Sequence, residues 1–496
     1  MMTQYLLTSL IFLPVAAALA LLLVPKNFQS YYKWVALAVS LVQVLILLNV
    51  FAHFDHLGAG FQLQERAHWI DLSLGTGALT VEYFVAIDGL SLPLVALAVL
   101  VLLLILNGAV IGSFCALDLL LFYLFFEFML LPMYFLIGIW GGPRREYASI
   151  KFFLYTLLGS ILILLVLIGL YVSSDPKTFV FTELIQLENL GIDSIFSVES
   201  NWIILGVPAR TWAFVFLLIG FGIKLPLVPL HTWLPDAHVE ASTPISVVLA
   251  ALLLKIGGYG LLRMAYPLFP DSAVALSGVV AFLGMLSIVY GAMNALASKD
   301  LKRLIAYSSV SHMGFILLGL ASATVEGVTG AIFQMTSHGL ISAMLFLIAG
   351  VLYDRTHDRT IANYSGLASK MPVYTSFVLI AFFATLGLPG LSGFIGEVMV
   401  FLGAFRSDLV PGWMAILSTG GLVFGAGYCL WTIQRMFFGQ YAVKDNVAMT
   451  DLVFREKLML LPLALLILVL GIFPQVIIKY INPFSLWLTA IIHEGL

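Results

Sequence analysis

The sequence predicts an all-α integral membrane protein with about 13–14 transmembrane helices. Of its 496 residues, 61% are hydrophobic and only 10% are charged, whereas an average soluble domain has roughly 45–50% and 25%. The apolar residues form runs of about 20 that are apolar on every side, which is typical of helices that cross a bilayer. A membrane barrel would show apolar residues at alternate positions, so we expect no strands.

The first apolar run extends to Val24 and is expected to be an uncleaved first span, because it lacks a positively charged leading segment. Hydropathy predicts twelve further spans. Their approximate limits are 33–53, 86–111, 117–139, 149–172, 210–229, 242–268, 274–297, 303–321, 327–351, 373–403, 412–437 and 457–479. The largest polar stretches, 54–85 and 173–209, are interpreted as loops that cap the bundle.

Basic residues predict the orientation of the bundle, because cytoplasmic loops carry an excess of Lys and Arg. Thirteen of them fall in alternate loops, at Arg144, Arg145, Lys151, Lys299, Lys302, Arg303, Arg355, Arg359, Lys370, Arg435, Lys444, Arg455 and Lys457. The loops between these hold only Lys177, Arg210, Arg263, Arg406 and Lys479. The first set of loops is therefore expected to face the cytoplasm.

Six ionisable residues fall deep inside the predicted spans, where a charge costs roughly 3 kcal/mol unless it is paired or hydrated. They are Glu127, Lys224, Lys255, His312, His338 and Glu397. A row of desolvated acids and bases can accept and release protons near neutral pH when its partners move. The pattern therefore predicts a proton relay, and a packing role stays open as an alternative, most of all for the two histidines.

Proline and glycine interrupt two spans beside these residues. Lys224 lies in GFGIKLPLVP, and Glu397 follows GLPGLSGFIG. Proline removes a backbone donor and disrupts the helical hydrogen bonds, and helices broken inside the membrane are typical of transporters. We therefore expect a discontinuous helix at each position.

No cofactor or metal site is predicted on this chain. Cys115 and Cys429 lie far apart in apolar runs, without the spacing of a disulfide framework, a haem motif or an iron–sulfur cluster. His231 and His238 in HTWLPDAH are interpreted as loop or interface residues. The net charge of -3 and the scattered basic residues exclude a nucleic-acid-binding surface. Any redox centre is therefore expected on another chain.

Over nearly its whole length the sequence resembles the antiporter-like subunits of respiratory complex I, the NADH-quinone oxidoreductase. The resemblance rests on GFGIKLPLVPLHTWLPDAHVEASTPISVVLAALLLKIGGYGLLR, on DLKRLIAYSSVSHMGF and on AIDGLSLPL. The segment FFEFMLLPMYFLIGIWGG and a glutamate rather than a lysine at position 397 make it most similar to the M-type members of that family.

This resemblance implies a fold of two inverted five-helix repeats, each with a broken helix. Segment 1–116 would hold the N-terminal helices, 117–268 and 274–437 the two proton-channel repeats, and 438–496 a C-terminal helix and tail. The implied activity is proton translocation through the bacterial inner membrane, driven by quinone reduction in partner subunits. Flavin, iron–sulfur clusters and quinone are implied on those partners, with neighbouring antiporter-like chains and lipid as the contacts of this one.

The resemblance also implies a role for each buried residue. Glu127 would be the partner of Lys224, and Lys255 would be the central lysine. His312 and His338 would connect this lysine to Glu397, the terminal acid.

One stretch departs from the family, whose members place two complete helices and a charged loop before the glutamate-bearing helix. Here Asp88 and Glu127 are 39 positions apart, which is about 60 Å of helix, one crossing and part of the next. One crossing is therefore expected to be missing. The loops that hold Lys26 and Arg144 are then expected on opposite faces of the membrane.

Two other functions remain open. A subunit of a multisubunit sodium/proton antiporter would share the ancestry, although Glu397 argues against it because the antiporter relatives resemble the lysine type. A membrane scaffold without transport is disfavoured, since packing does not require four buried charges.

Overall fold

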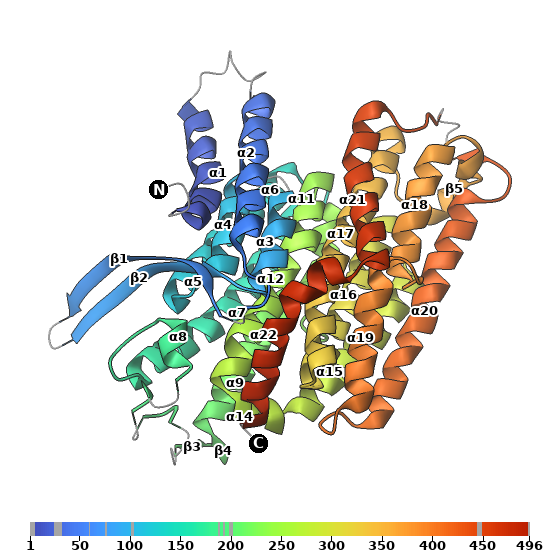
Figure 1. Cartoon of the computed structure of the whole chain (residues 1–496). Coiled ribbons are helices and arrows are strands. Elements are labelled where there is room, and N and C mark those ends of the chain that lie inside the picture. Colours follow the sequence, from blue (N-terminus) through green and yellow to red (C-terminus); the bar gives the residue numbers. More distant parts are fainter. Residues whose placement is uncertain are drawn as a thin grey trace.

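Long apolar helices stand side by side in the computed structural model and form one bundle (Figure 1). The structure describes residues 5–23, 32–58, 60–74, 77–100, 104–186, 189–191, 194–197, 202–443 and 449–494. Within these residues, nine helices are long and apolar enough to cross a membrane. Lys26 and Lys444, which enter the predictions of topology and orientation, lie outside the described residues.

The first part of the bundle contains the helices as far as α10, which follows the first break. Their bounds are α1 Leu6–Leu23, α2 Tyr32–His53, α3 Ser91–Leu100, α4 Leu104–Cys115, α5 Leu119–Phe128, α6 Leu130–Trp140, α7 Arg145–Ser173, α8 Phe181–Leu184, α9 Ala209–Lys224 and α10 Trp233–Glu240. Asp118 caps α5, since its carboxylate accepts a hydrogen bond from the amide of Leu121 (2.9 Å).

The remaining helices complete the bundle. Their bounds are α11 Thr243–Val248, α12 Leu254–Gly260, α13 Tyr266–Leu268, α14 Pro270–Ala275, α15 Ser277–Ala297, α16 Leu301–Ala321, α17 Val325–Thr356, α18 Pro372–Thr385, α19 Ser392–Arg406, α20 Gly412–Phe437, α21 Phe454–Ile472 and α22 Gln475–Glu494. Two π-helical turns, η3 Leu249–Leu253 and η4 Leu261–Ala265, flank α12. The short pairs of strands are β3 Ile203–Ile204 with β4 Val207–Pro208, and β5 Tyr364–Ser365 with β6 Ala442–Val443.

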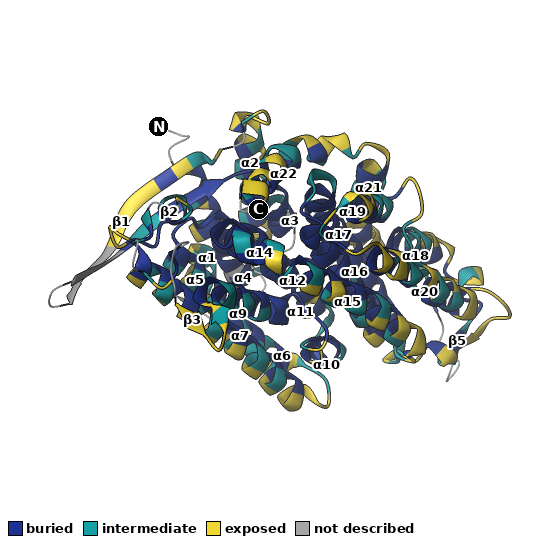
Figure 2. Cartoon of the chain, turned by 90° about the horizontal axis from the view of Figure 1, so that it is seen from below, coloured by how far each residue is buried: buried dark blue, intermediate teal, exposed yellow. Residues whose placement is uncertain are grey.

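The centre of the bundle is built from the continuous segment Thr243–Leu268 together with α16 and α17. In the most apolar stretch of each segment, all residues of Thr243–Leu268 are buried, and 94% of the residues of α16 and of α17 are buried. In α20, on the outside of the bundle, the buried share is 33%. Figure 2 shows the same distribution, with buried residues around α12, α16 and α17 and exposed residues on the outer helices. Side chains on the central helices are therefore shielded from lipid.

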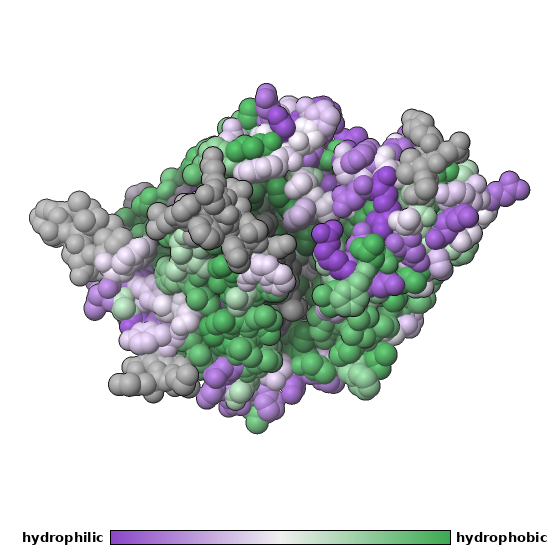
Figure 3. Space-filling view, turned by 90° about the horizontal axis from the view of Figure 1, so that it is seen from above, coloured by the Kyte–Doolittle hydropathy of each residue, from purple (hydrophilic) through white to green (hydrophobic). Residues whose placement is uncertain are grey.

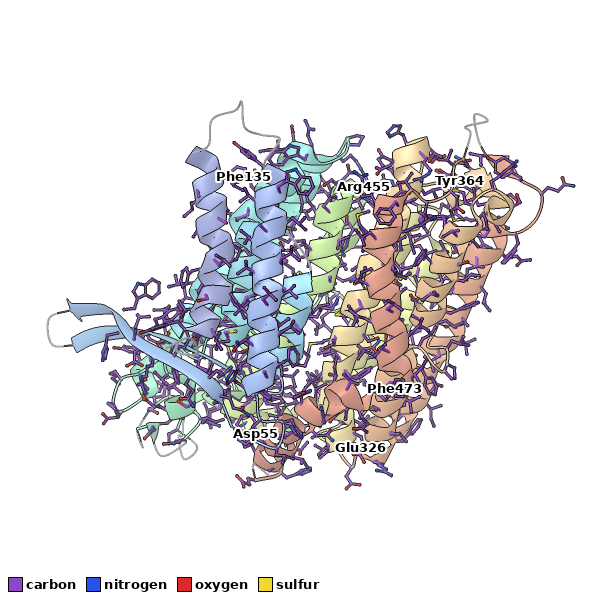
Figure 4. The ribbon with its side chains drawn as sticks, turned by 45° about the horizontal axis from the view of Figure 1, so that its top comes forward. Asp55, Phe135, Glu326, Tyr364, Arg455 and Phe473 are labelled. Carbon is purple, nitrogen blue, oxygen red and sulfur yellow. The ribbon has the colours of Figure 1, made fainter. Side chains whose placement is uncertain are left out.

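The two faces of the bundle are marked by ion pairs. On the upper face, as Figure 1 is drawn, Arg144 pairs with Glu240 and Arg359 with Asp300. On the lower face Arg210 pairs with Asp271. Figure 4 shows Phe135, Tyr364 and Arg455 toward the upper face and Asp55, Glu326 and Phe473 toward the lower face. Seen from above, hydrophilic residues gather on the side of α18 and α20 (Figure 3).

Both predicted helix breaks are present, and they run in opposite directions. Helix α9 rises from the lower face to Lys224, and residues 225–232 separate it from α10. Helix α18 descends from the upper face to Thr385, and residues 386–391 separate it from α19. Opposite directions are what two inverted repeats require.

The polar stretch 54–85 is a β-hairpin, so the expectation of a loop without strands is wrong here. Strand β1, Gln62–Leu74, pairs antiparallel with β2, Gly77–Ile87. Arg66 ties the hairpin to the lower face, since it forms ion pairs with Glu82 and with Glu183 of α8. The end of β2, from Phe84 to Ile87, packs in the buried core, whereas Arg66–Trp69 of β1 are exposed.

The predicted span 86–111 is also wrong, because α3 and α4 do not form one crossing helix. Their outer ends meet: Val85 bridges Ala116, and the amide of Leu117 donates to the carbonyl of Phe84 (2.8 Å). The two helices also contact each other along their length. At 10 and 12 residues they are only about 15 and 18 Å long. They form a hairpin that enters the bundle from the lower face and returns to it.

This re-entrant hairpin changes the topology expected from the sequence. Within the residues that the structure describes here, α2 and the pair α5–α6 cross the bundle and α3–α4 does not, so the start of α2 and the end of α6 lie on the same, upper face (Figure 1). The prediction that the loops of Lys26 and Arg144 face opposite sides is therefore contradicted by the helices that flank them. In place of a membrane-crossing helix, the chain has the α3–α4 hairpin, which begins and ends on the lower face.

Cysteine labelling tests this arrangement. In a background without Cys115 and Cys429, single cysteines at Trp34 and Glu146 are expected to react with an impermeant thiol reagent from one face. A cysteine at Asp55 should react only from the other face. Accessibility is measured in sealed vesicles of both orientations, and labelling of Trp34 and Glu146 from opposite faces would show that α3–α4 crosses the membrane.

The C-terminal part contains two helices where one span, 457–479, was predicted. Helix α21 ends at Ile472, and α22 begins at Gln475 and runs obliquely across the lower half of the bundle (Figure 1). Helix α22 packs on α17 of one half and on α13 and α14 of the other. It therefore joins the two halves at the lower face.

Candidate functional site

Lys255 lies at the centre of the bundle, and its side chain is fully buried. Its ammonium group donates to the carbonyl of Ala250 and contacts Nδ1 of His338 at 2.7 Å. The π-helical turn η3 ends two residues before it, and such turns free backbone groups and are frequent at functional sites. No acid forms an ion pair with Lys255 among the described residues, so an imidazole is its closest ionisable partner.

Two histidines and a glutamate continue the row from Lys255. The ring centroids of His338 and His312 are 5.3 Å apart. Nδ1 of His312 then lies 3.6 Å from Oε1 of Glu397. The four residues come from four helices, α12, α17, α16 and α19, and each is at most 6% exposed. Each group is an acid or a base that can exchange a proton with its neighbour.

The second helix break positions Glu397. Gly387 and Gly390 in this break have φ angles of +75° and +93°, which other residues rarely adopt. A Cβ atom at Gly387 would lie 2.2 Å from Oε2 of Glu397. Only a glycine therefore lets the broken backbone approach the carboxylate this closely.

A small cavity adjoins Glu397 and His312. It is lined by the break at Thr385 and Leu386 and by Tyr428 of α20. Its volume for a water-sized sphere is ≈ 10 Å³, about what one water molecule needs. The acid at the end of the row thus borders space that one water can occupy.

Glu127 and Lys224 lie close together but are not in contact. No ion pair within 4 Å joins them among the described residues, although Glu127 attracts Lys224 electrostatically. The ammonium group of Lys224 lies 3.7 Å from the centre of the Phe126 ring, and Oε1 of Glu127 is buried without a hydrogen-bond partner. The two residues therefore lie near each other without an ion pair, and each buried group lacks a direct partner in the other.

Two further polar residues of this region were not predicted from the sequence to lie beside the row. Gln334 donates to Nδ1 of His312 (3.1 Å); its place four residues before His338, on the same face of the helix, was the available signal. His238 was interpreted as a loop or interface residue, but it lies in α10 and is fully buried with both ring nitrogens unpaired. The charges of Lys255 and of Lys302 both act on it, so it lies between the row and the upper face.

His231 lies in the first break as expected for a loop residue, against the rings of Tyr290 and Tyr307. Cys115 and Cys429 are both free and buried. Over the part of the chain that the structure describes, no group of three or more His, Cys, Asp or Glu side chains could hold a metal ion.

The chain matches one family model, described as "NADH:quinone oxidoreductase/Mrp antiporter, TM", over residues 116–424. This range includes all six relay candidates and both helix breaks. The re-entrant hairpin and α22 lie outside it.

Curated relatives match nearly the whole chain. The NADH-quinone oxidoreductase subunit M of Rhodobacter capsulatus is 40% identical, over 97% of this chain and 95% of the relative. The NAD(P)H-quinone oxidoreductase chain 4 of Synechococcus elongatus is also 40% identical, over 99% of this chain and 92% of the relative.

Solved structures agree with these relatives. A chain of respiratory complex I from Thermus thermophilus superposes with a TM-score of 0.83 at 32% identity, covering 98% of this chain and 99% of that one. A chain of the Mrp complex from Dietzia has a TM-score of 0.82 at 18% identity, covering 99% of both chains. The second likeness shows a shared fold alone.

Proposed function

Because the chain belongs to the NADH:quinone oxidoreductase/Mrp antiporter family of membrane subunits, we propose that it is a proton-translocating subunit of an NADH-quinone oxidoreductase and that the buried row is its relay. The observation that carries the proposal is the contact sequence Lys255, His338, His312, Glu397 across four central helices. It offers a proton a series of acceptors inside an otherwise apolar bundle.

The row needs a supply of protons at one end and a driver. Lys302, at the upper end of α16, and the unpaired His238 lead from the upper face toward Lys255. Moving one charge against 100 mV costs about 2.3 kcal/mol, so a partner must supply energy. A change in the distance between Glu127 and Lys224 would alter the electrostatic potential at the row. A neighbouring subunit could drive the relay in this way.

The cofactors, partners and location follow from this proposal. Flavin, iron–sulfur clusters and quinone are assigned to other subunits of the complex, since Cys115 and Cys429 are separate buried thiols. Neighbouring antiporter-like chains are assigned to the flanks of the bundle, and the upper face to the cytoplasmic side of a bacterial inner membrane.

Glu127→Gln tests the proposed pair. Glutamine carries no negative charge and cannot draw the ammonium group of Lys224 away from the Phe126 ring, so we expect NADH-driven proton pumping to fall several-fold. Pumping is measured by dye quenching in inverted membrane vesicles, with assembly of the complex checked on native gels. Glu146→Gln, on the exposed start of α7, is the matched control. Normal pumping by assembled Glu127→Gln would remove this residue from the mechanism.

A further inference from the structure

A buried ion pair outside the row lies between Lys255 and the lower face. Arg263 is 2% exposed, and its Nη2 donates to Oδ1 of Asp88 at 2.6 Å. The sequence placed Arg263 in a loop, and that prediction is wrong, since it lies in the π-helical turn η4 inside the bundle. It follows Lys255 by eight residues, about 12 Å along the helix toward the lower face.

Aromatic rings enclose this guanidinium group. The rings of Phe61, Tyr259 and Phe484 have their centres 4.9, 5.3 and 5.3 Å from its central carbon, and that of Phe181 lies at 5.9 Å. The four rings come from the approach to β1 and from α12, α22 and α8. Elements far apart in the chain thus converge on one charge, stabilise it through their π faces and leave little room for water.

Among the described residues, Asp88 is the one acid that hydrogen-bonds to Arg263, and the ion pair occupies its Oδ1. Tyr259, one turn after Lys255, accepts a hydrogen bond from Nε of Arg263 (3.1 Å) and donates its own proton to the carbonyl of Phe114 (3.0 Å). Arginine keeps its charge in proteins and accepts no hydrogen bond. Oδ1 of Asp88 already accepts from Arg263 and from the amide and hydroxyl of Ser91.

The guanidinium group of Arg263 keeps its proton in the ion pair and accepts none, and arginines help to exclude protons in selective pores. We propose that Arg263, held by Asp88 and its aromatic rings, is a barrier that closes the lower side of Lys255 to protons. Protons on Lys255 then leave sideways through His338. This inference rests on the proposed proton relay. It adds a residue that prevents protons from passing directly from Lys255 to the lower face.

The test measures passive proton leak through the assembled complex without NADH. The complex is reconstituted into liposomes that contain a pH-sensitive dye, the potential is clamped with potassium and valinomycin, and a pH step is applied. The double variant Arg263→Met/Asp88→Asn removes the charge without leaving an unpaired carboxylate, and we expect the leak rate to rise at least about fivefold. Arg263→Lys keeps a positive charge and should leak as wild type does.

The matched control is Arg210→Met/Asp271→Asn. It removes another buried arginine and its acid near the lower face, away from Lys255, and should leave the leak unchanged. Adding Lys255→Met to Arg263→Met/Asp88→Asn should return the leak to the wild-type rate, because the path would then lack its central acceptor. If Arg263→Met/Asp88→Asn does not assemble, Arg263→Gln/Asp88→Asn, which keeps a hydrogen bond, is measured with the same expectation.

A wild-type leak rate in the assembled neutral pair would overturn the barrier. So would an equal rise in the control pair, or a leak that persists without Lys255. None of these readings needs pumping, so the barrier can fail while NADH-driven pumping through the row is intact. Conversely, loss of the relay assignment would appear in the pumping assays alone.

Discussion

Glu397→Gln is expected to reduce NADH-driven proton pumping to less than about a tenth of the wild-type rate, because a positioned proton donor or acceptor typically contributes 100-fold or more. Glutamine keeps the size and the hydrogen bonding of the side chain but cannot take a proton from His312, 3.6 Å away. The row then ends at the histidine. The measurement is the initial rate of dye quenching in inverted vesicles that contain the assembled complex.

Glu397→Asp is the informative comparison, since it shortens the side chain but keeps a carboxylic acid. We expect it to retain a substantial part of the pumping rate. Glu326→Gln, which removes the carboxylate partner of Arg406 on the lower face, serves as the control for losing an acid from the same pair of helices. Equal pumping by the glutamine and aspartate variants would make Glu397 a packing residue.

Lys255→Met should abolish proton pumping, to below about 1% of wild type, because Lys255 is the titratable group at the start of the row, in contact with His338. Methionine has a similar volume and no titratable group. His338 would then lose its 2.7 Å partner, and a proton from Lys302 and His238 would have no acceptor at the centre. Coupled quinone reduction, measured as inhibitor-sensitive NADH oxidation, should fall in parallel.

Lys255→Arg separates proton transfer from a need for positive charge. Arginine keeps its proton in proteins, so it supplies the charge but cannot take part in a relay. We expect it to be as inactive as methionine in complexes that assemble normally. Restoration of pumping by arginine would mean that Lys255 acts as a fixed charge.

The residues of the row could be predicted because burying a charge in a membrane is costly. A lysine or glutamate in the middle of an apolar run therefore stands out without any knowledge of the fold. The breaks were equally visible, since Pro226, Pro229 and Pro389 disrupt helices by simple covalent geometry. What the sequence could not provide was the order of contacts, because His312 and Glu397 are 85 positions apart and meet only through packing.

Signals that depend on pairing were missed. The hairpin β1–β2 was missed because its strands mix polar and apolar residues, as in QLQERAHWIDLSL, and so resemble a polar loop. Arg263 was counted as a loop charge because its distance from the end of the predicted span was small. Its burial depends on Asp88, which comes from a distant segment and neutralises it.

The stretch between Asp88 and Glu127 shows where hydropathy fails for a different reason. Residues 86–111 are apolar enough to span a bilayer, and apolarity is all that a hydropathy window measures. Whether the chain turns back depends on Phe84 and Leu117 pairing at the base. Because of that contact, the two short helices return to the face from which they started, and the segment does not cross the membrane.

The α3–α4 hairpin therefore makes the sidedness of the protein independent of the length of this segment. A deletion or insertion that changes both arms equally shortens or lengthens the hairpin but never exchanges the two sides of everything that follows. The part next to the relay is the inner end of α3, where Leu97 packs so closely on Gly339 that a Cβ there would lie 2.4 Å from its side chain. A change in the length of the arms would therefore keep the sidedness of the protein but displace the side chain that packs beside His338.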